Sequence, residues 1–254
     1  MPEPLPGRLK HDQVAEHRDG DMVVRYPRSE HETALASVEV VRALWPVVER
    51  YLGARWSGRL RLELLAEART SGANPAAATL RHAVRGMQVR SPVTAGVLSL
   101  QLGQVLWYAA SGEAHYRGAA PRCPDWLLVA ALTPLTHVWS DRQAWSDHVA
   151  RHLQRAARRR PLPEAALASQ VGLAPGVLAQ AVSQSIARGQ SLGQRHPDWV
   201  RSLLARLAAE PQADGLRALS AVTRADATTW RERFTADLEA WRAEDDEWRP
   251  VVVA

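Results

Sequence analysis

The chain has 254 residues, 46% of them hydrophobic, which is enough to bury the core of one large domain or two small ones. No early segment has the pattern of a signal peptide, and no run approaches the roughly 20 apolar residues that a membrane span needs. The single cysteine, Cys123, excludes an internal disulfide and a cysteine-rich zinc knuckle, so we interpret it as structural. We therefore expect a globular cytoplasmic protein without membrane contact.

The charge is moderately basic, with 32 Lys+Arg against 27 Asp+Glu and a net charge of +5. Lys10 is the only lysine, so arginine supplies almost all of the positive charge. The planar guanidinium group suits phosphates and carboxylates, which favours an anionic partner. The same excess also fits the compositional bias of a GC-rich genome, and both interpretations stay open.

The first expected elements follow a polar beginning. Residues 1–20 are rich in proline, glycine and charge, which predicts a flexible tail. The stretch "DMVVRYP", residues 21–27, is short and β-branched, as a strand should be. Ser29 and Glu32 then predict a capping box that opens a helix, and Gly53 is placed to end it.

The predicted helix carries apolar residues at helical spacing, namely Leu35, Val38, Val41, Leu44, Trp45, Val48 and Leu52. After it, "RLRLELLAEA" alternates leucine with charged residues, which predicts a half-buried strand at 59–68. "HAVRGMQVRSP", residues 82–92, predicts another strand that Pro92 stops. A small mixed sheet is therefore expected in the N-terminal part.

From Thr94 onward the periodicity is helical. The predicted helices are 94–112, 124–138, 141–159, 163–171, 176–192, 197–209, 213–221 and 228–247. The last should begin with a capping box of Thr229 and Glu232 and bury Trp230, Phe234, Leu238 and Trp241. The sequence therefore predicts an α+β fold, with one domain over 21–254 that has a sheet-containing lobe (21–112) and a helical lobe (113–254).

The stretch "VLSLQLGQVLWY", residues 97–108, has the character of a zinc-peptidase helix. Such a helix needs two histidines one turn apart and a glutamate beside the first, and a later helix supplies a third ligand. This stretch follows the segments "HRDGDMVVRYP", "YLGARW" and "GRLRLELL" and precedes "PDWLLVAAL". That order of segments resembles the peptidase MA-like, or gluzincin, superfamily of zinc metallopeptidases. The resemblance covers most of residues 21–247 and implies a gluzincin-like, metallopeptidase-like domain.

The resemblance places Leu100 at the first ligand, Gln101 at the general base, Gln104 at the second ligand and Val129 at the third ligand. Leucine and valine have no donor atom, and a glutamine amide is a weak ligand that cannot accept a proton near neutral pH. The zinc site would be lost, and the two glutamines would form a local amide pair. A buried helix without any catalytic history would account for the same stretch.

The resemblance thus implies a pseudoenzyme without metal or cofactor, kept as a binding or regulatory module. A protein or peptide partner would bind in the former substrate cleft, along a strand at 83–90. In the family, the corresponding strand runs antiparallel along that cleft. Val182, Arg188 and Gly189 stand where the family has aromatic residues, which implies a rebuilt cleft wall.

Two histidines suggest a different class of function, a metal-dependent hydrolase with a relocated site. His148 and His152 are one helical turn apart with Asp147 adjacent, so both could ligate a metal. The alternative is two solvated or interfacial histidines on a polar face. Glu113 and His115 could also place a carboxylate and an imidazole at one edge of the cleft.

A run of arginines before Pro161 suggests a third class, DNA or RNA binding. The run comprises Arg151, Arg155, Arg158, Arg159 and Arg160. Three of them share a helix face, which suits phosphate groups. The alternative is a solvated helix end, where the helix macrodipole favours arginine.

Overall fold

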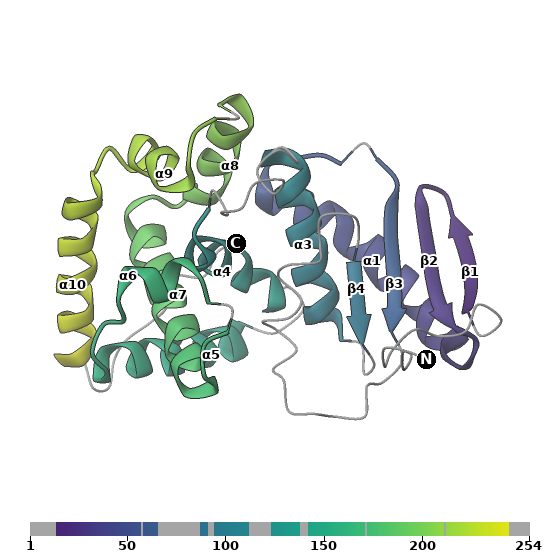
Figure 1. The fold of residues 1–254 in the computed structure, drawn as a ribbon, viewed down its shortest axis with the longest axis horizontal. Coiled ribbons are helices and arrows are strands. Elements are labelled where there is room, and N and C mark those ends of the chain that lie inside the picture. Colours follow the sequence, from purple (N-terminus) through teal and green to yellow (C-terminus); the bar gives the residue numbers. More distant parts are fainter. Residues whose placement is uncertain are drawn as a thin grey trace, which may run out of the picture.

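The fold places a small sheet at one end of the molecule and a group of helices at the other (Figure 1). The structure is a computed structural model. It describes residues 14–56, 58–65, 87–90, 94–111, 123–137, 142–170, 172–210 and 212–243. The predicted α+β class is confirmed.

The first half of the chain builds the sheet and the helices that cover it. Its elements are β1 (Val14–Asp19), β2 (Met22–Pro27), the short 3-10 helix η2 (Arg28–Glu30), α1 (His31–Leu52), β3 (Leu60–Leu65), β4 (Met87–Arg90) and α3 (Ala95–Ser111). In the described part of the chain the sheet has the order β1-β2-β3-β4. β1 is antiparallel to β2, whereas β2, β3 and β4 are mutually parallel, so the predicted mixed sheet is confirmed.

The second half is helical, as predicted. Its elements are α4 (Asp125–Leu132), the 3-10 helix η5 (Thr133–His137), α5 (Arg142–Arg158), α6 (Glu164–Ala168), α7 (Pro175–Arg195), α8 (Trp199–Ala209), α9 (Gly215–Thr223) and α10 (Ala227–Ala243). The helix α7 contacts α4, α5, α6 and α10. It is therefore the central helix of this half, and α10 lies at the outer end of the molecule (Figure 1).

The predicted flexible tail is wrong for its last residues. β1 lies inside the segment 1–20 and pairs with β2 across a two-residue turn, with Val14 opposite Pro27 and Asp19 opposite Met22. The sequence "VAEHRD" hides this strand because it has few apolar residues, and its side chains are only half-buried or exposed. The strand is held by its pairing with β2 rather than by a hydrophobic face, so its sequence carries no pattern that predicts it.

Both predicted capping boxes are wrong. η2 includes Ser29, so α1 begins only at His31, and its start has no side-chain cap. The cap of α10 is the Asp226 carboxylate, which accepts a hydrogen bond from the Thr229 main-chain N–H at 2.7 Å. The predicted end of α1 is confirmed, because Gly53 adopts a left-handed conformation with φ of 67° and its N–H bonds to the carbonyl of Glu49.

The hydrophobic core follows the predicted alternation. Leu60, Leu62 and Leu64 are buried, and Arg61 between them is exposed. They pack in one apolar cluster with α1, α3 and residues of α4, α8 and α9. On α1 the predicted face is buried except at Leu35, which is 37% exposed, and Trp45, which is partly buried.

α3 joins the two halves, because it contacts α1, β4, η5 and α8. Gly103 allows η5 to approach closely, since a Cβ at this position would lie 2.3 Å from Leu135 Cδ1. A second apolar cluster joins α5, α7 and α10. The faces of α10 predicted to be buried, with Trp230, Phe234, Leu238 and Trp241, are confirmed.

The orientation of β4 differs from the one implied by the resemblance. Met87 lies opposite Leu62 and Arg90 opposite Leu65, and the two strands are parallel. The implied antiparallel strand is therefore wrong for 87–90, whereas 83–86 lie outside the described residues. In the described part of the chain β4 is the last strand of the sheet.

Candidate functional site

The four positions that the resemblance assigns to zinc chemistry lie on two contacting helices. Leu100, Gln101 and Gln104 are on α3, and Val129 is on α4. Leu100 and Val129 are half-buried, whereas Gln101 is 2% exposed and Gln104 is 0% exposed. These residues contribute neither an imidazole nor a carboxylate, so they do not fit a zinc ion.

Gln104 is the unusual residue of α3. Among the described residues, neither its Nε2 nor its Oε1 has a hydrogen-bond partner, although both atoms are buried. The predicted amide pair with Gln101 is therefore wrong. A buried polar group left unpaired costs about 1–3 kcal/mol, so Gln104 lowers the stability of the fold where an apolar side chain would not.

Three histidine rings gather where α5 meets η5. The rings of His148 and His152 are 4.6 Å apart, and the ring of His137 lies 4.4 Å from that of His148. Trp145 stacks on His148 from the same helix. The sequence did not indicate His137, because it precedes α5 in a separate 3-10 helix and no motif spacing connects it to the pair.

These histidines are held neutral at pH 7. The pKa of His148 is lowered to about 4, mainly by burial and to a smaller extent by the nearby imidazoles of His152 and His137 and by Arg151. Burial also lowers the pKa of His152 to about 4, with Arg155 the next cause. The pKa of His137 is lowered by burial and by Arg151.

A hydrogen bond joins His152 to α7. Ser183 Oγ lies 2.8 Å from the carbonyl of Ala179, to which it donates, and 3.0 Å from His152 Nδ1, where the imidazole tautomer sets which atom donates. Asp147 is exposed and accepts a hydrogen bond from Gln143 rather than orienting an imidazole.

Among the residues that the structure describes, no group of three or more His, Cys, Asp or Glu is placed to hold a metal ion. In the described part of the chain, no carboxylate is bonded to the histidine pair as the base of a metal-dependent hydrolase would be, because Asp147 bonds Gln143 instead. Glu113 and His115 lie outside the described residues. Cys123 is buried.

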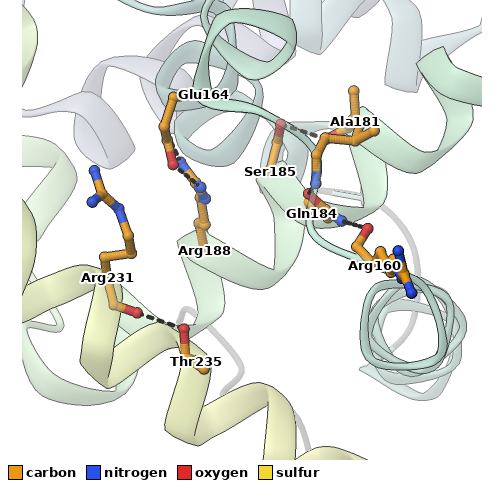
Figure 2. A network of polar contacts seen from close by, with 9 residues as sticks. Arg160, Glu164, Ala181, Gln184, Ser185, Arg188, Arg231 and Thr235 are labelled. Atoms are coloured by element: carbon orange, nitrogen blue, oxygen red, sulfur yellow. Dashed lines mark hydrogen bonds and ion pairs between the residues drawn. The ribbon is translucent and has the colours of Figure 1, made fainter.

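Arg188 occupies an interior position on α7. Its side chain is 4% exposed and makes two hydrogen bonds to the Glu164 carboxylate, at 3.0 and 2.5 Å (Figure 2). The guanidinium carbon lies 4.9 Å from the ring centre of Trp126, 5.2 Å from Trp230 and 5.3 Å from Phe234. The Arg188 hydrogen bonds hold the pKa of Glu164 below its usual value. Arg188 thus connects α7 to α4, α6 and α10.

Gln184 and Ser185 make further contacts from α7. Gln184 Oε1 accepts from the Leu162 N–H at 3.0 Å, and its Nε2 donates to the Arg160 carbonyl at 3.1 Å (Figure 2). Ser185 Oγ donates to the Ala181 carbonyl and accepts from Gln170 Nε2. These polar groups hold the segment after α5 against α7.

The predicted arginine run is exposed throughout, at positions 151, 155, 158, 159 and 160. In the described part of the chain none of these guanidinium groups forms an ion pair with a carboxylate. Arg188, Arg195 and Arg206, by contrast, are each paired with an acid. The run is the largest group of unpaired positive charge on a single described helix and its end.

Comparison of the sequence with protein-family models finds no match, and comparison with curated proteins finds no significant match. The described helices also include none with the combined length and apolar character that a bilayer crossing requires.

Proposed function

We propose that this chain is a catalytically inactive, metallopeptidase-like protein of gluzincin-like fold, and that it acts in the cytoplasm as a binding or regulatory module. The observation that carries the proposal is the chemistry of α3. Its buried Gln104, at the position where the resemblance places a zinc ligand, has no donor suited to zinc and no hydrogen-bond partner among the described residues. Leu100 and Val129 add no donor atom.

The binding surface of this proposal is the edge of the sheet beside α3. β4 ends the sheet in the described part of the chain, and α3 contacts it. An edge strand presents main-chain N–H and C=O groups that an extended peptide can pair with. The partner we propose is therefore a protein segment that binds β4 in an extended conformation.

Metal content tests the inactive zinc site. Purified protein, and the same protein incubated with zinc and desalted, should both contain far less than one metal ion per chain by elemental analysis. Close to one zinc per chain in each sample would contradict the proposal. If zinc binds, the variant His148→Ala/His152→Ala separates the sources, because zinc that persists in it points to α3 and α4.

Hydrogen exchange tests the binding surface. Peptides selected for binding from a random display library should slow amide exchange in β4, because strand addition pairs its outward N–H groups. β1 is the control, since it forms the opposite edge of the sheet in the described part of the chain. Slowed exchange at β1 alone, or at neither edge, would place the binding surface elsewhere.

A further inference from the structure

The helix α5 and the residues after it carry a group of positive charges that the fold does not use. This group, the α5 arginine face, comprises Arg151, Arg155, Arg158, Arg159 and Arg160, all exposed and without an acidic partner in the described part of the chain. Asp147 is the only acidic residue of α5, and Gln143 bonds to it. Among the described residues, the α5 arginine face therefore has no counter-charge.

Side chains of α10 and α7, rather than these arginines, bond a carbonyl of the last turn of α5 and one just after it. The carbonyl of Ala157 accepts hydrogen bonds from Nε and Nη2 of Arg242 on α10, at 2.9 and 2.5 Å. The carbonyl of Arg160 accepts from Gln180 Nε2 at 2.6 Å and from Gln184 Nε2 at 3.1 Å (Figure 2). The arginines at the end of α5 leave these carbonyls to other side chains.

The opposite side of α5 is packed. Trp145, Val149, Leu153 and Ala156 are buried in the cluster shared with α7 and α10. α5 thus exposes no apolar stripe that could enter a lipid headgroup layer. A ligand of the α5 arginine face is consequently a polyanion in water, and it meets a helix held in place by two others.

We propose that the α5 arginine face binds the phosphate backbone of nucleic acid. Arg151 to Arg159 covers about 12 Å at roughly 1.5 Å per helical residue. Each strand of a duplex carries a phosphate about every 3.4 Å along the axis, so a length of about 12 Å spans roughly three or four phosphates of one strand. The guanidinium fork pairs with phosphate oxygens in a bidentate manner. Such contacts carry no base sequence information, so binding is independent of sequence.

His152 provides a local probe of this binding. The pKa of His152 is lowered most by burial, then by Arg155 and Arg151, and least by His137 of η5. From α7, the uncharged Ser183 hydroxyl contacts the ring. A phosphate that neutralises Arg151 and Arg155 removes part of that repulsion, so bound nucleic acid raises the pKa of His152.

The first experiment measures fluorescence anisotropy of a labelled random-sequence 20-base-pair duplex over a range of salt concentrations. Contacts to three or four phosphates predict a slope of about −2.7 to −3.6 in log affinity against log salt, which is a roughly 40-fold to 150-fold loss between 50 and 200 mM. Absent binding, or binding that does not change with salt, overturns the proposal. So does equal affinity for a poly-glutamate peptide, which would indicate an acidic protein instead.

The variant Arg155→Gln/Arg158→Gln should make the slope shallower by about 2, because two phosphate contacts are lost. The matched control is Arg50→Gln/Arg217→Gln, which removes the same charge from exposed positions on α1 and α9. An equal loss in both variants would show that only net charge matters and would overturn the proposal. NMR titration of His152 is the second readout, since its pKa should rise on addition of duplex to the wild-type protein and stay unchanged if the duplex binds elsewhere.

Discussion

α3 and α7 are the central buried helices of the two halves, and they differ in how they treat buried polar side chains. On α3, Gln104 is fully buried, and neither of its amide atoms has a partner in the part of the chain that the structure describes. On α7, Gln184 is equally buried, and both of its amide atoms are bonded. Ser185 and Arg188 of α7 are also bonded, although Arg188 Nε is not.

This difference shows that polar residues are buried in the two helices for two different reasons. The polar residues of α7 are explained by the elements around them, because they fasten α6, α10 and the segment after α5 to the central helix. Gln104 has no such explanation, since no described residue bonds its amide. A buried polar side chain that lacks hydrogen bonds and gains nothing in return is typical of a functional position. This agrees with our proposal that α3 descends from an active-site helix.

The largest expected effect comes from removing the counter-charge of Arg188. Glu164→Ala should destabilise the fold by about 2–3 kcal/mol, because it leaves a buried guanidinium without a carboxylate. Arg188→Met should cost less, about 1–2 kcal/mol, because methionine can fill the space between the rings and Glu164 is 45% exposed to water. Urea unfolding measures both, and the reverse order would contradict this role for α7.

The two buried glutamines should respond with opposite signs to the same substitution. Gln184→Leu should lower the free energy of unfolding by about 1–2 kcal/mol, because it leaves the Leu162 N–H unpaired. Gln104→Leu should raise it by about 1 kcal/mol, because it removes two unpaired atoms. Thermal unfolding of each variant measures the change, and a destabilised Gln104→Leu would mean that the amide has a partner after all.

Acid should weaken the contact between α5 and α7 by a smaller amount. The pKa of His148 and that of His152 are both lowered to about 4 in the fold, so the unfolded chain takes up protons first as the pH falls. The stability present above pH about 6.5 is lost progressively towards pH 4. The melting temperature should therefore be lower at pH 5 than at pH 7.

The variant His152→Asn sharpens this test. Its amide can still donate to Ser183 Oγ, but it cannot be protonated in this range. The drop in melting temperature between pH 7 and pH 5 should therefore be smaller than in the wild type. An unchanged drop would assign the acid sensitivity to other groups.

The helices were predictable because their signal is local. From 94 onward each predicted helix is found, with ends that differ by a few residues, since an apolar face at helical spacing is strongly marked in residues such as Trp230, Phe234 and Leu238. The strand β1 was missed because its own residues carry no such pattern. The capping residues were missed because several polar residues stand near each helix start and only the backbone conformation chooses among them.

The candidate site was predictable only in its chemistry. That Leu100, Gln104 and Val129 offer no zinc donor follows from their side chains alone. Two other features of the site depend on residues that other helices bring near. They are the lack of a described partner for Gln104 and the ring contact between His137 and His148.

By itself, the sequence determined the helices, the strands β2 and β3, the exposed arginines of α5 and the absence of zinc donors on α3. Each of these depends on side-chain type and short-range periodicity. Only the tertiary structure decided that β4 runs parallel to β3, that Glu164 pairs with Arg188, and that Arg242 caps α5. These arrangements join residues far apart in the chain, and no local pattern encodes a partner that only packing brings within hydrogen-bond distance.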